Sequence, residues 1–369
     1  MKICVYAICK NESQFVDRWL KSMSEADQII VMDTGSEDDT VERLKQGGAI
    51  VARREVSPWR FDVARNLSLE LVPEDADICV CTDLDEVLRP GWRQALEAAW
   101  RPGHTRALYR YTWNFNPDGS EGYVFWTNKI HARHGYRWTH PVHEVLTWTR
   151  TDRPENQVTV EGLQLDHHAD PKKSRASYLA LLELSVQEDP ADDRNMHYLG
   201  REYMFRGQWD RCIDTLKRHL ALPNATWADE RCASMRFIAR AYLQKGDEDS
   251  AKAWYLRAVA EAPHLREPYV ELANLLHRRA EWDGVVYFTG CALKINRRPR
   301  TYICESDAWG SLPWDLRALG LFYTGRGEQS LRAAEEALRI SPDNQRLQNN
   351  LRLIREALNQ PSGAGDARM

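Results

Sequence analysis

The sequence lacks three features that mark large classes of protein: a long apolar run, paired cysteines and an excess of charge of one sign. No apolar run approaches the ~20 residues that a membrane-spanning helix needs, and the first residues show no charged-then-apolar signal pattern. The eight cysteines include no Cys-x-x-Cys pair, and several stand inside apolar runs, as buried reduced thiols do. We therefore expect a cytoplasmic protein with no transmembrane segment and no disulfide framework.

The charge balance and the missing motifs narrow the function classes. With 50 basic and 54 acidic residues the net charge is −4, so nucleic acid is not indicated as a partner, although a local basic groove is not excluded. The sequence has no glycine-rich phosphate loop, no Ser–His–Asp set and no dinucleotide fingerprint. What remains is a globular protein of 369 residues, long enough for two or more domains.

The first ~170 residues alternate short β-branched runs with amphipathic stretches, which is typical of a parallel α/β sheet. The expected strands are residues 2–9, 28–32, 49–53 and 77–82, and the expected helices are residues 15–24, 40–46 and 63–71. Polar residues collect directly after the strands. Because ligands of open α/β sheets bind outside the carboxyl ends of the strands, we expect the site there.

After Pro171 helix signals dominate, and small residues, turn glycines and prolines recur at similar offsets. The stretch from Tyr203 to Pro223 has counterparts in residues 242–263, 273–292 and 314–342, and an insert at residues 305–312 breaks the register before the last. These units resemble tetratricopeptide repeats, whose period is ~34 residues, while a generic helical bundle is the alternative. We expect an α/β domain at residues 1–170, helical repeats at 171–358 and a disordered tail at 359–369.

The strongest local motif is Asp83-Leu84-Asp85-Glu86, directly after an apolar strand. Two carboxylates on alternate residues at a strand end can share a divalent cation whose shell a diphosphate completes. Such a cation would neutralise charge on a departing nucleotide diphosphate. On its own the pattern is equally common in solvated surface turns.

The order of motifs along the chain favours a cation and nucleotide site at Asp83 and Asp85 over a solvated surface turn. Polar segments follow the successive strands or open a helix: Cys9-Lys10-Asn11-Glu12, Asp33-Thr34-Gly35-Ser36, Phe61-Asp62-Val63-Ala64-Arg65-Asn66 and Asp83-Leu84-Asp85-Glu86. This series resembles the family 2 glycosyltransferases of the GT-A (Rossmann-like) fold. It is most similar to the bacterial and phage branch with C-terminal tetratricopeptide repeats, which includes bacteriocin peptide glycosyltransferases. The Gln-x-x-Arg-Trp motif of the processive membrane synthases is missing, so we expect transfer of one sugar.

The resemblance implies a role for each matching residue. Glu12 and the backbone at Ala7 and Ile8 would hold the nucleoside, and Asp33 would bond the base or ribose. Arg65, with Asn66 beside it, would contact the diphosphate or support the loop of Asp83 and Leu84, and Asp83 would face the ribose or donor sugar. For Asp33 a simple capped turn, and for Asn66 a local cap, are the structural alternatives.

The histidines suggest further ligands and the general base. Asp85 would ligate the metal with a histidine of the pair His167-His168, of which we favour His167, and imidazole suits Mn²⁺ better than Mg²⁺. Glu144 is the predicted catalytic base, with Asp83 and His143 behind it. Two alternatives stay open: a structural histidine pair at the domain joint, and a zinc site formed by His131, His134, His140 and His143.

These inferences predict a metal-dependent, inverting glycosyltransferase that takes one sugar from a nucleotide-diphosphate donor, with UDP favoured. A protein or peptide acceptor and a homodimer would use the repeats, and Trp113 or Trp126 would line the acceptor cleft. The alternatives are a glycan, lipid-linked or nucleic-acid-base acceptor, and a repeat scaffold whose sugar-nucleotide domain is inactive.

Overall fold

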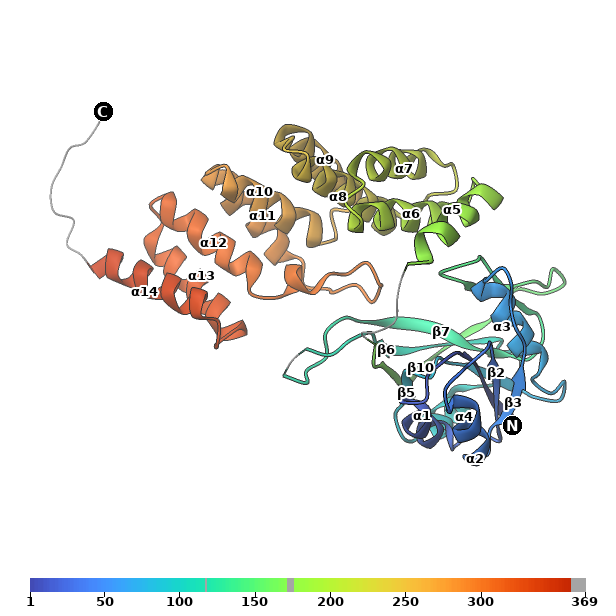
Figure 1. The fold of residues 1–369 in the computed structure, drawn as a ribbon. Helices are drawn as coiled ribbons and strands as arrows, with labels where there is room; N and C mark the ends of the chain where they lie inside the picture. Colours follow the sequence, from blue (N-terminus) through green and yellow to red (C-terminus); the bar gives the residue numbers. More distant parts are fainter. Residues whose placement is uncertain (117, 171–175, 360–369) are drawn as a thin grey trace, which may run out of the picture. The chain divides into compact units, whose positions relative to one another are not determined.

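The computed structural model describes residues 1–116, 118–170 and 176–359, and the chain divides into two compact units (Figure 1). The first comprises Met1–Pro190 with Arg300–Tyr302, and the second comprises Ala191–Pro299 and the described residues from Ile303 onward. The predicted α/β domain followed by an all-helical repeat domain is confirmed. The expectations for the joint at Pro171 and for the tail from residue 360 fall outside the described residues.

An eight-stranded mixed sheet forms the first unit, in the order β3-β2-β1-β4-β7-β6-β10-β5. Strands β1, β2, β3 and β4 run parallel, β7 runs antiparallel to its neighbours β4 and β6, and β5 runs antiparallel to β10. A two-stranded sheet joins β8 to β9. The strands are β1 (Ile3–Cys9), β2 (Gln28–Asp33), β3 (Ile50–Arg53), β4 (Ile78–Cys81), β5 (Glu86–Leu88), β6 (Arg106–Thr112), β7 (Val124–Ala132), β8 (Tyr136–Thr139), β9 (Val145–Trp148) and β10 (Gln157–His167).

Both faces of the central strands are buried, as their unbroken apolar sequences require. Alternate residues of β1, beginning with Ile3, pack with Trp19 of α1 and Trp92 of α4, while Cys4 and Tyr6 pack on the opposite face with Trp138 of β8. The helices of this unit are α1 (Val16–Met23), α2 (Thr40–Gln46), α3 (Phe61–Glu70), α4 (Trp92–Ala99) and α5 (Tyr178–Glu188).

Helix α5 explains why the first unit continues beyond the predicted boundary at residue 170. The ring of Tyr178 makes edge contacts with Phe61 at 6.0 Å and with His143 at 5.7 Å between centroids. At the other end of α5, Glu188 pairs with Arg60 at 2.5 Å. These long-range contacts are consistent with the place of the helix in the first unit.

The second unit consists of antiparallel helix pairs: α6 (Asp193–Phe205) with α7 (Trp209–Ala221), α8 (Ala228–Gln244) with α9 (Glu248–Glu261), α10 (Glu267–Arg278) with α11 (Trp282–Lys294), and α12 (Leu312–Tyr323) with α13 (Gly327–Ile340), followed by α14 (Gln345–Asn359). The short 3₁₀ helix η1 (Ser306–Trp309) precedes α12. In the part of the chain that the structure describes, no helix is both long and apolar enough to cross a membrane.

Every pair turns in the same way. A carbonyl in the last turn of the first helix accepts a hydrogen bond from the backbone amide five residues later. The donor and acceptor are Gln208 and Tyr203 (2.9 Å), Asp247 and Tyr242 (3.0 Å), Glu281 and Leu276 (2.9 Å), and Arg326 and Leu321 (2.9 Å). The residue before each donor has a positive φ, and it is Gly207, Gly246, Ala280 and Gly325 in turn. The predicted repetition is therefore present in the backbone, with one alanine in a position that favours glycine.

We expect Ala280→Gly to stabilise the second unit by about 1 kcal/mol. Ala280 is exposed and has a φ of 54°, a left-handed backbone conformation that is sterically unfavourable for alanine but not for glycine. Gly246→Ala is the matched control and should destabilise by a similar amount, since its φ is 79° while the added Cβ would meet no atom within 4 Å. Denaturant unfolding of the second unit measures both. Equal signs for the two changes would contradict this account of the turns.

Candidate active site

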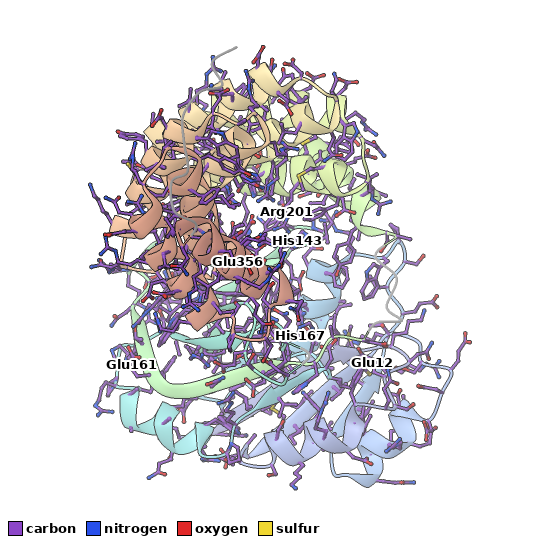
Figure 2. The ribbon with its side chains drawn as sticks, turned by 90° about the vertical axis from the view of Figure 1, so that its left-hand side faces the viewer. Glu12, His143, Glu161, His167, Arg201 and Glu356 are labelled. Carbon is purple, nitrogen blue, oxygen red and sulfur yellow. The ribbon has the colours of Figure 1, made fainter. Side chains whose placement is uncertain are left out.

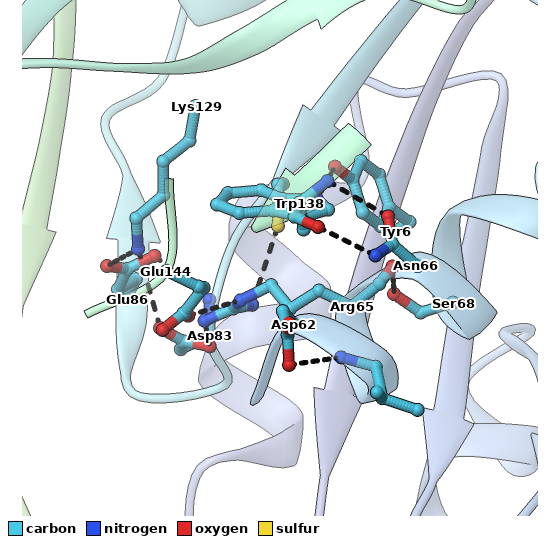
Figure 3. A network of polar contacts seen from close by, with 12 residues as sticks. Tyr6, Asp62, Arg65, Asn66, Ser68, Asp83, Glu86, Lys129, Trp138 and Glu144 are labelled. Carbon is cyan, nitrogen blue, oxygen red and sulfur yellow. Dashed lines mark hydrogen bonds and ion pairs between the residues drawn. The ribbon is translucent and has the colours of Figure 1, made fainter. Parts of the chain in front are cut away.

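The site begins where β4 ends, at the carboxylate of Asp83. Arg65 Nη2 donates to Asp83 Oδ1 at 2.8 Å, and Lys129 Nζ lies 3.5 Å from Oδ2, so each carboxylate oxygen has its own cation (Figure 3). The two cations come from α3 and from β7, the strand that pairs with β4. Asp83 is thus held in a fixed orientation by groups distant in sequence.

Arg65 connects two of the predicted catalytic residues. Its guanidinium is buried, and besides Asp83 it donates through Nε to Glu144 Oε1 at 2.7 Å. The ring of Trp138 covers the guanidinium at 5.3 Å. Arg65 is the fifth residue of α3 and lies past its first turn, so the macrodipole has little effect on it, and the two carboxylates compensate for its buried charge. These contacts join Arg65 to the Asp83 loop, and its two expected roles, contact with the diphosphate and support of that loop, stay predictions.

Sequence reasoning missed a second layer made of Glu86, Lys129 and Tyr111. Glu86 accepts the Asp83 backbone amide at 2.9 Å and the Tyr111 hydroxyl at 2.8 Å, and Lys129 lies 3.1 Å from it. Burial alone would lower the pKa of Lys129, but Glu86 and Asp83 outweigh it and raise the pKa, so the ammonium stays charged. The sequence offered two signals for this layer: Glu86 is an acid directly after Asp85, and Lys129 is a lone lysine inside a β-strand pattern.

Asp85 meets His167 across the sheet edge. Strand β10 pairs with β5 so that His167 stands opposite Glu86, and His167 Nε2 lies 3.7 Å from Asp85 Oδ2. His167 Nδ1 lies 2.8 Å from the Trp113 carbonyl oxygen, which accepts only a protonated Nδ1. Nε2 then faces Asp85, and once this nitrogen has lost its proton, such a carbonyl-oriented imidazole beside a carboxylate is a donor set that fits a divalent cation.

The neighbouring His168 is oriented differently. Its ring stacks on Phe115 at 5.4 Å between centroids, and its backbone amide donates to the Asp85 carbonyl oxygen at 2.8 Å. Burial lowers the pKa of His168. Burial also lowers that of His167, but Asp85 and the Trp113 carbonyl outweigh it and raise the pKa. Of the two predicted ligands, His167 is the one whose ring faces Asp85.

Residues 4–145 match the family model of glycosyl transferase family 2. The first unit contains a family 2 glycosyltransferase domain. The match spans the sheet from β1 to the start of β9 and includes Asp83, Asp85 and Glu144, while His167 lies beyond it on the last long strand. The resemblance found in the order of the motifs is therefore confirmed for this domain.

The helical unit is similar to solved repeat structures at low identity. A crystal structure of MamA is 16% identical over 46% of this chain and 83% of MamA, with a TM-score of 0.36. YrrB, a TPR protein with an unusual peptide-binding site, is 13% identical over 46% of this chain and 80% of its own, with a TM-score of 0.36. The APC/C hetero-tetramer Cut9–Hcn1 is 12% identical over 51% of this chain and 34% of its own, with a TM-score of 0.40. At these scores the likeness carries no argument, and the repeat assignment rests on the helix pairs.

The predicted nucleoside residues lie at the ends of β1 and β2 in the glycosyltransferase domain. Ala7 and Ile8 are buried in β1, and Glu12, labelled with His167 in Figure 2, is buried in the loop that follows and donates its amide to Thr40. Asp33 is fully buried, and its carboxylate accepts the amides of Gly35 and Ser36. This is the capped turn that was the alternative for Asp33, and its ribose role stays a prediction.

The hydrogen bonds of the Asn66 side chain go to the backbone of Trp138. Its side-chain amide donates to the Trp138 carbonyl oxygen at 2.8 Å, and its oxygen accepts the Trp138 amide at 2.9 Å. It therefore pairs with β8 as a neighbouring strand would. Leu84 is fully buried in the loop between the two aspartates, where its side chain anchors the loop in the core.

The proposed zinc cluster of four histidines is wrong. Among residues 1–116, 118–170 and 176–359, no three His, Cys, Asp or Glu side chains converge as metal ligands. His131 is fully buried between the Tyr6 hydroxyl and the Ala132 carbonyl, each at 2.8 Å, while His134 lies near Glu74. In the same part of the chain, Asp85 and His167 face each other as a pair and not as part of a group of three such side chains.

His131 predicts acid sensitivity of the glycosyltransferase domain. Burial lowers its pKa to about 3, whereas the unfolded chain has an ordinary value near 6.5. Below pH 6.5 the unfolded state therefore binds a proton that the folded state excludes, and stability falls as pH falls. Between pH 7 and pH 5 this residue alone should cost about 2 kcal/mol.

His131→Gln retains an acceptor for Tyr6 but has no titrating ring, so denaturant unfolding should show a pH dependence flatter by that amount. His134→Gln, at a side chain 55% exposed, is the control. A pH dependence of His131→Gln equal to that of the unsubstituted chain would contradict the role of His131.

Proposed function

We propose that this chain transfers one sugar from a nucleotide-diphosphate donor, favourably a UDP-sugar, to an acceptor in a metal-dependent and inverting reaction. The observation that carries the proposal is the pair Asp85 and His167 at the edge of a family 2 glycosyltransferase domain. Their facing atoms are 3.7 Å apart, close to the ~3 Å between neighbouring ligands of one cation with bonds near 2.1 Å.

The proposed division of labour follows from the contacts. Asp85 and His167 hold Mn²⁺ or Mg²⁺, which when bound supplies charge neutralisation to the departing nucleotide diphosphate. Asp83 faces the donor sugar or ribose in an orientation that Arg65 and Lys129 maintain. Arg65 and Lys129 are both engaged by carboxylates. Their positive charges therefore balance the Asp83 loop, and these two side chains do not bind the diphosphate directly.

Glu144 remains the proposed general base, with Asp83 joined to it through Arg65 and His143 next to it in the sequence, where the His143 ring lies against Tyr178. Its carboxylate Oε1 is bound by Arg65, and its side chain is 13% exposed. An arriving hydroxyl would give its proton to the carboxylate while attacking the anomeric carbon, and the bond to the diphosphate oxygen would break. Trp113 is 47% exposed and its ring lies 4.6 Å from that of His167, which suits it to an acceptor or donor sugar.

The acceptor is proposed to be a protein or peptide bound by the helical unit, which also offers the surface for a homodimer. Stacked helix pairs present extended surface and few catalytic groups, so they suit recruitment. The same chemistry on a glycan, a lipid-linked sugar or a nucleic-acid base is the second candidate. A repeat scaffold with an inactive sugar-nucleotide domain is the third.

The test is a panel of nucleotide sugars incubated with the full chain and Mn²⁺, with nucleotide release as the readout and mass spectrometry of acceptors from lysate as the second step. We expect at least one UDP-sugar to release UDP slowly even without acceptor, since water can substitute for it. No release from any donor, with or without lysate, would support the inactive scaffold instead.

A further inference from the structure

A buried ion cluster in the second unit contains a carboxylate that does not come from the repeats. Arg236 and Arg240, one turn apart on α8, both contact Glu271 of α10, at 2.5 Å and 2.8 Å. Both also contact Glu305, at 2.6 Å and 2.7 Å. The Arg236 side chain is 1% exposed, whereas that of Glu305 is 29% exposed. Two guanidiniums thus share one carboxylate of the helices and one of another segment.

Glu305 belongs to the insert that breaks the repeat register between α11 and α12. The Glu305 amide and the Trp309 indole both donate to Glu267 Oε1, at 3.1 Å and 3.2 Å, and Arg266 lies 4.1 Å above the Trp309 ring. The insert therefore lies along the first helices of two successive pairs, α8 and α10. Glu305 is held there by polar contacts, whereas Ala308 is buried in the apolar core of the helices with Trp309 packed against it.

A cavity of about 310 Å³ adjoins the cluster. Glu305, Asp307 and Ala308 of the insert line it, and the helices supply apolar and hydrogen-bonding side chains, among them Leu243, Tyr255, Val270 and Asn274, together with the charged groups of Glu267, Glu271 and Arg278. Arg236 Nη1 is buried and has no hydrogen-bond partner among the described residues. The guanidinium therefore has capacity for a further acceptor beside the apolar wall.

We propose that this pocket is a binding site for an acidic side chain of a peptide, and that Glu305 occupies it until such a peptide displaces the insert. Arg236 is too buried to lose a carboxylate without replacement, since an uncompensated buried charge costs several kcal/mol. Glu271 is fixed by its helix, so Glu305 is the exchangeable member. Two arginines that already bind a carboxylate at this cavity, with Arg278 also lining it, match an acidic side chain in charge.

The insert competes from within the chain, so the affinity of a free peptide is reduced by the fraction of time the pocket is open. All of these groups lie in the second unit, and the proposal does not depend on sugar transfer. Its test needs neither donor nor cation, so failure here and failure of the proposed activity are separate outcomes.

The experiment measures fluorescence anisotropy of labelled hexaglutamate on the full chain, with hexaglutamine as the uncharged probe. Glu305→Gln should bind hexaglutamate at least tenfold more tightly than the unsubstituted chain, because the internal competitor is weakened, and adding Arg240→Gln should abolish the gain. Glu356→Gln removes the same charge on α14, where Glu356 pairs with Arg352 far from this cluster in sequence, and should change nothing (Figure 2). Equal affinity of Glu305→Gln and the unsubstituted chain would overturn the proposal.

Hydrogen exchange on the unsubstituted chain gives a second measurement that does not require the variant to fold. Saturating hexaglutamate should accelerate exchange of the amides of residues 303–309, whose Glu305 amide is bonded to Glu267, whereas hexaglutamine should leave it unchanged. Protection of residues 303–309 that is identical with and without hexaglutamate would show that the insert is a fixed part of the fold and would also overturn the proposal.

Discussion

Asp85→Asn is expected to lower kcat/KM for sugar transfer at least 100-fold, a loss of about 2.7 kcal/mol or more in transition-state stabilisation. The substitution keeps the shape of the side chain and removes a charged oxygen ligand from the pair with His167. Asp85 lies in the loop between β4 and β5 and is 5% exposed, and asparagine fills the same space, so the free energy of unfolding should change by about 1 kcal/mol or less. Nucleotide release at saturating Mn²⁺ and denaturant unfolding measure the two quantities.

The matched control for Asp85→Asn is Asp152→Asn. Asp152 pairs with Arg150 at 2.7 Å on the surface, with a side chain 58% exposed, so the same change of charge should leave the kinetics unaltered. Turnover by Asp85→Asn within threefold of the unsubstituted chain at all Mn²⁺ concentrations would contradict the assignment of Asp85 to the cation.

Arg65→Met should destabilise the glycosyltransferase domain by about 3 kcal/mol or more, since it removes one partner from buried ion pairs. Asp83 and Glu144 would lose the guanidinium that both now share at 2.8 Å and 2.7 Å. Arg65→Lys retains the charge but not the planar fork, and should cost less. The effect is the change in the free energy of unfolding of this domain. It is measured by denaturant unfolding of the full chain, from the first transition in which the domain unfolds.

A double-mutant cycle separates this coupling from lost packing against Trp138. Asp83→Asn combined with Arg65→Met should be less destabilising than the sum of the single changes by more than 1 kcal/mol, because the double variant no longer leaves Asp83 charged without its arginine. Additivity within about 0.5 kcal/mol would mean that Arg65 stabilises the domain by packing alone.

The sequence predicted the parts of this site that follow from local pattern. An apolar strand followed by Asp83 and Asp85 places both carboxylates at the sheet edge, and the pair at 167–168 marks the end of the last long strand. Which histidine faces Asp85 depends on the register of β10 with β5. The preference for His167 came from the family pattern, and the geometry now gives a physical reason in its bond to the Trp113 carbonyl.

The contacts around Asp83 were beyond sequence reasoning for a physical reason. Lys129 reaches Glu86 only because β7 pairs antiparallel with β4, a pairing across more than 40 positions that hydrophobic periodicity does not encode. Asn66 and Asp33 illustrate the same limit. A polar side chain at a strand end or helix start is compatible with ligand binding and with backbone pairing, and only the tertiary fold decides between them.

The repeats show a similar division between pattern and packing. Glycines and small residues at constant offsets predicted the helix pairs, and even the position of Ala280 was part of the pattern. The register break at the insert was visible as well. The ion pairs of Glu305 with Arg236 and Arg240 could not be predicted, because neither arginine has a distinctive neighbour in sequence.

The most direct test of the central claim is the affinity of the full chain for UDP, measured by calorimetry with and without Mn²⁺. We predict that Mn²⁺ tightens UDP binding at least tenfold, that His167→Ala loses this gain, and that His168→Ala, whose ring stacks on Phe115, retains it. A UDP affinity that is the same with and without Mn²⁺, or a gain that survives in His167→Ala and disappears in His168→Ala, would contradict the account.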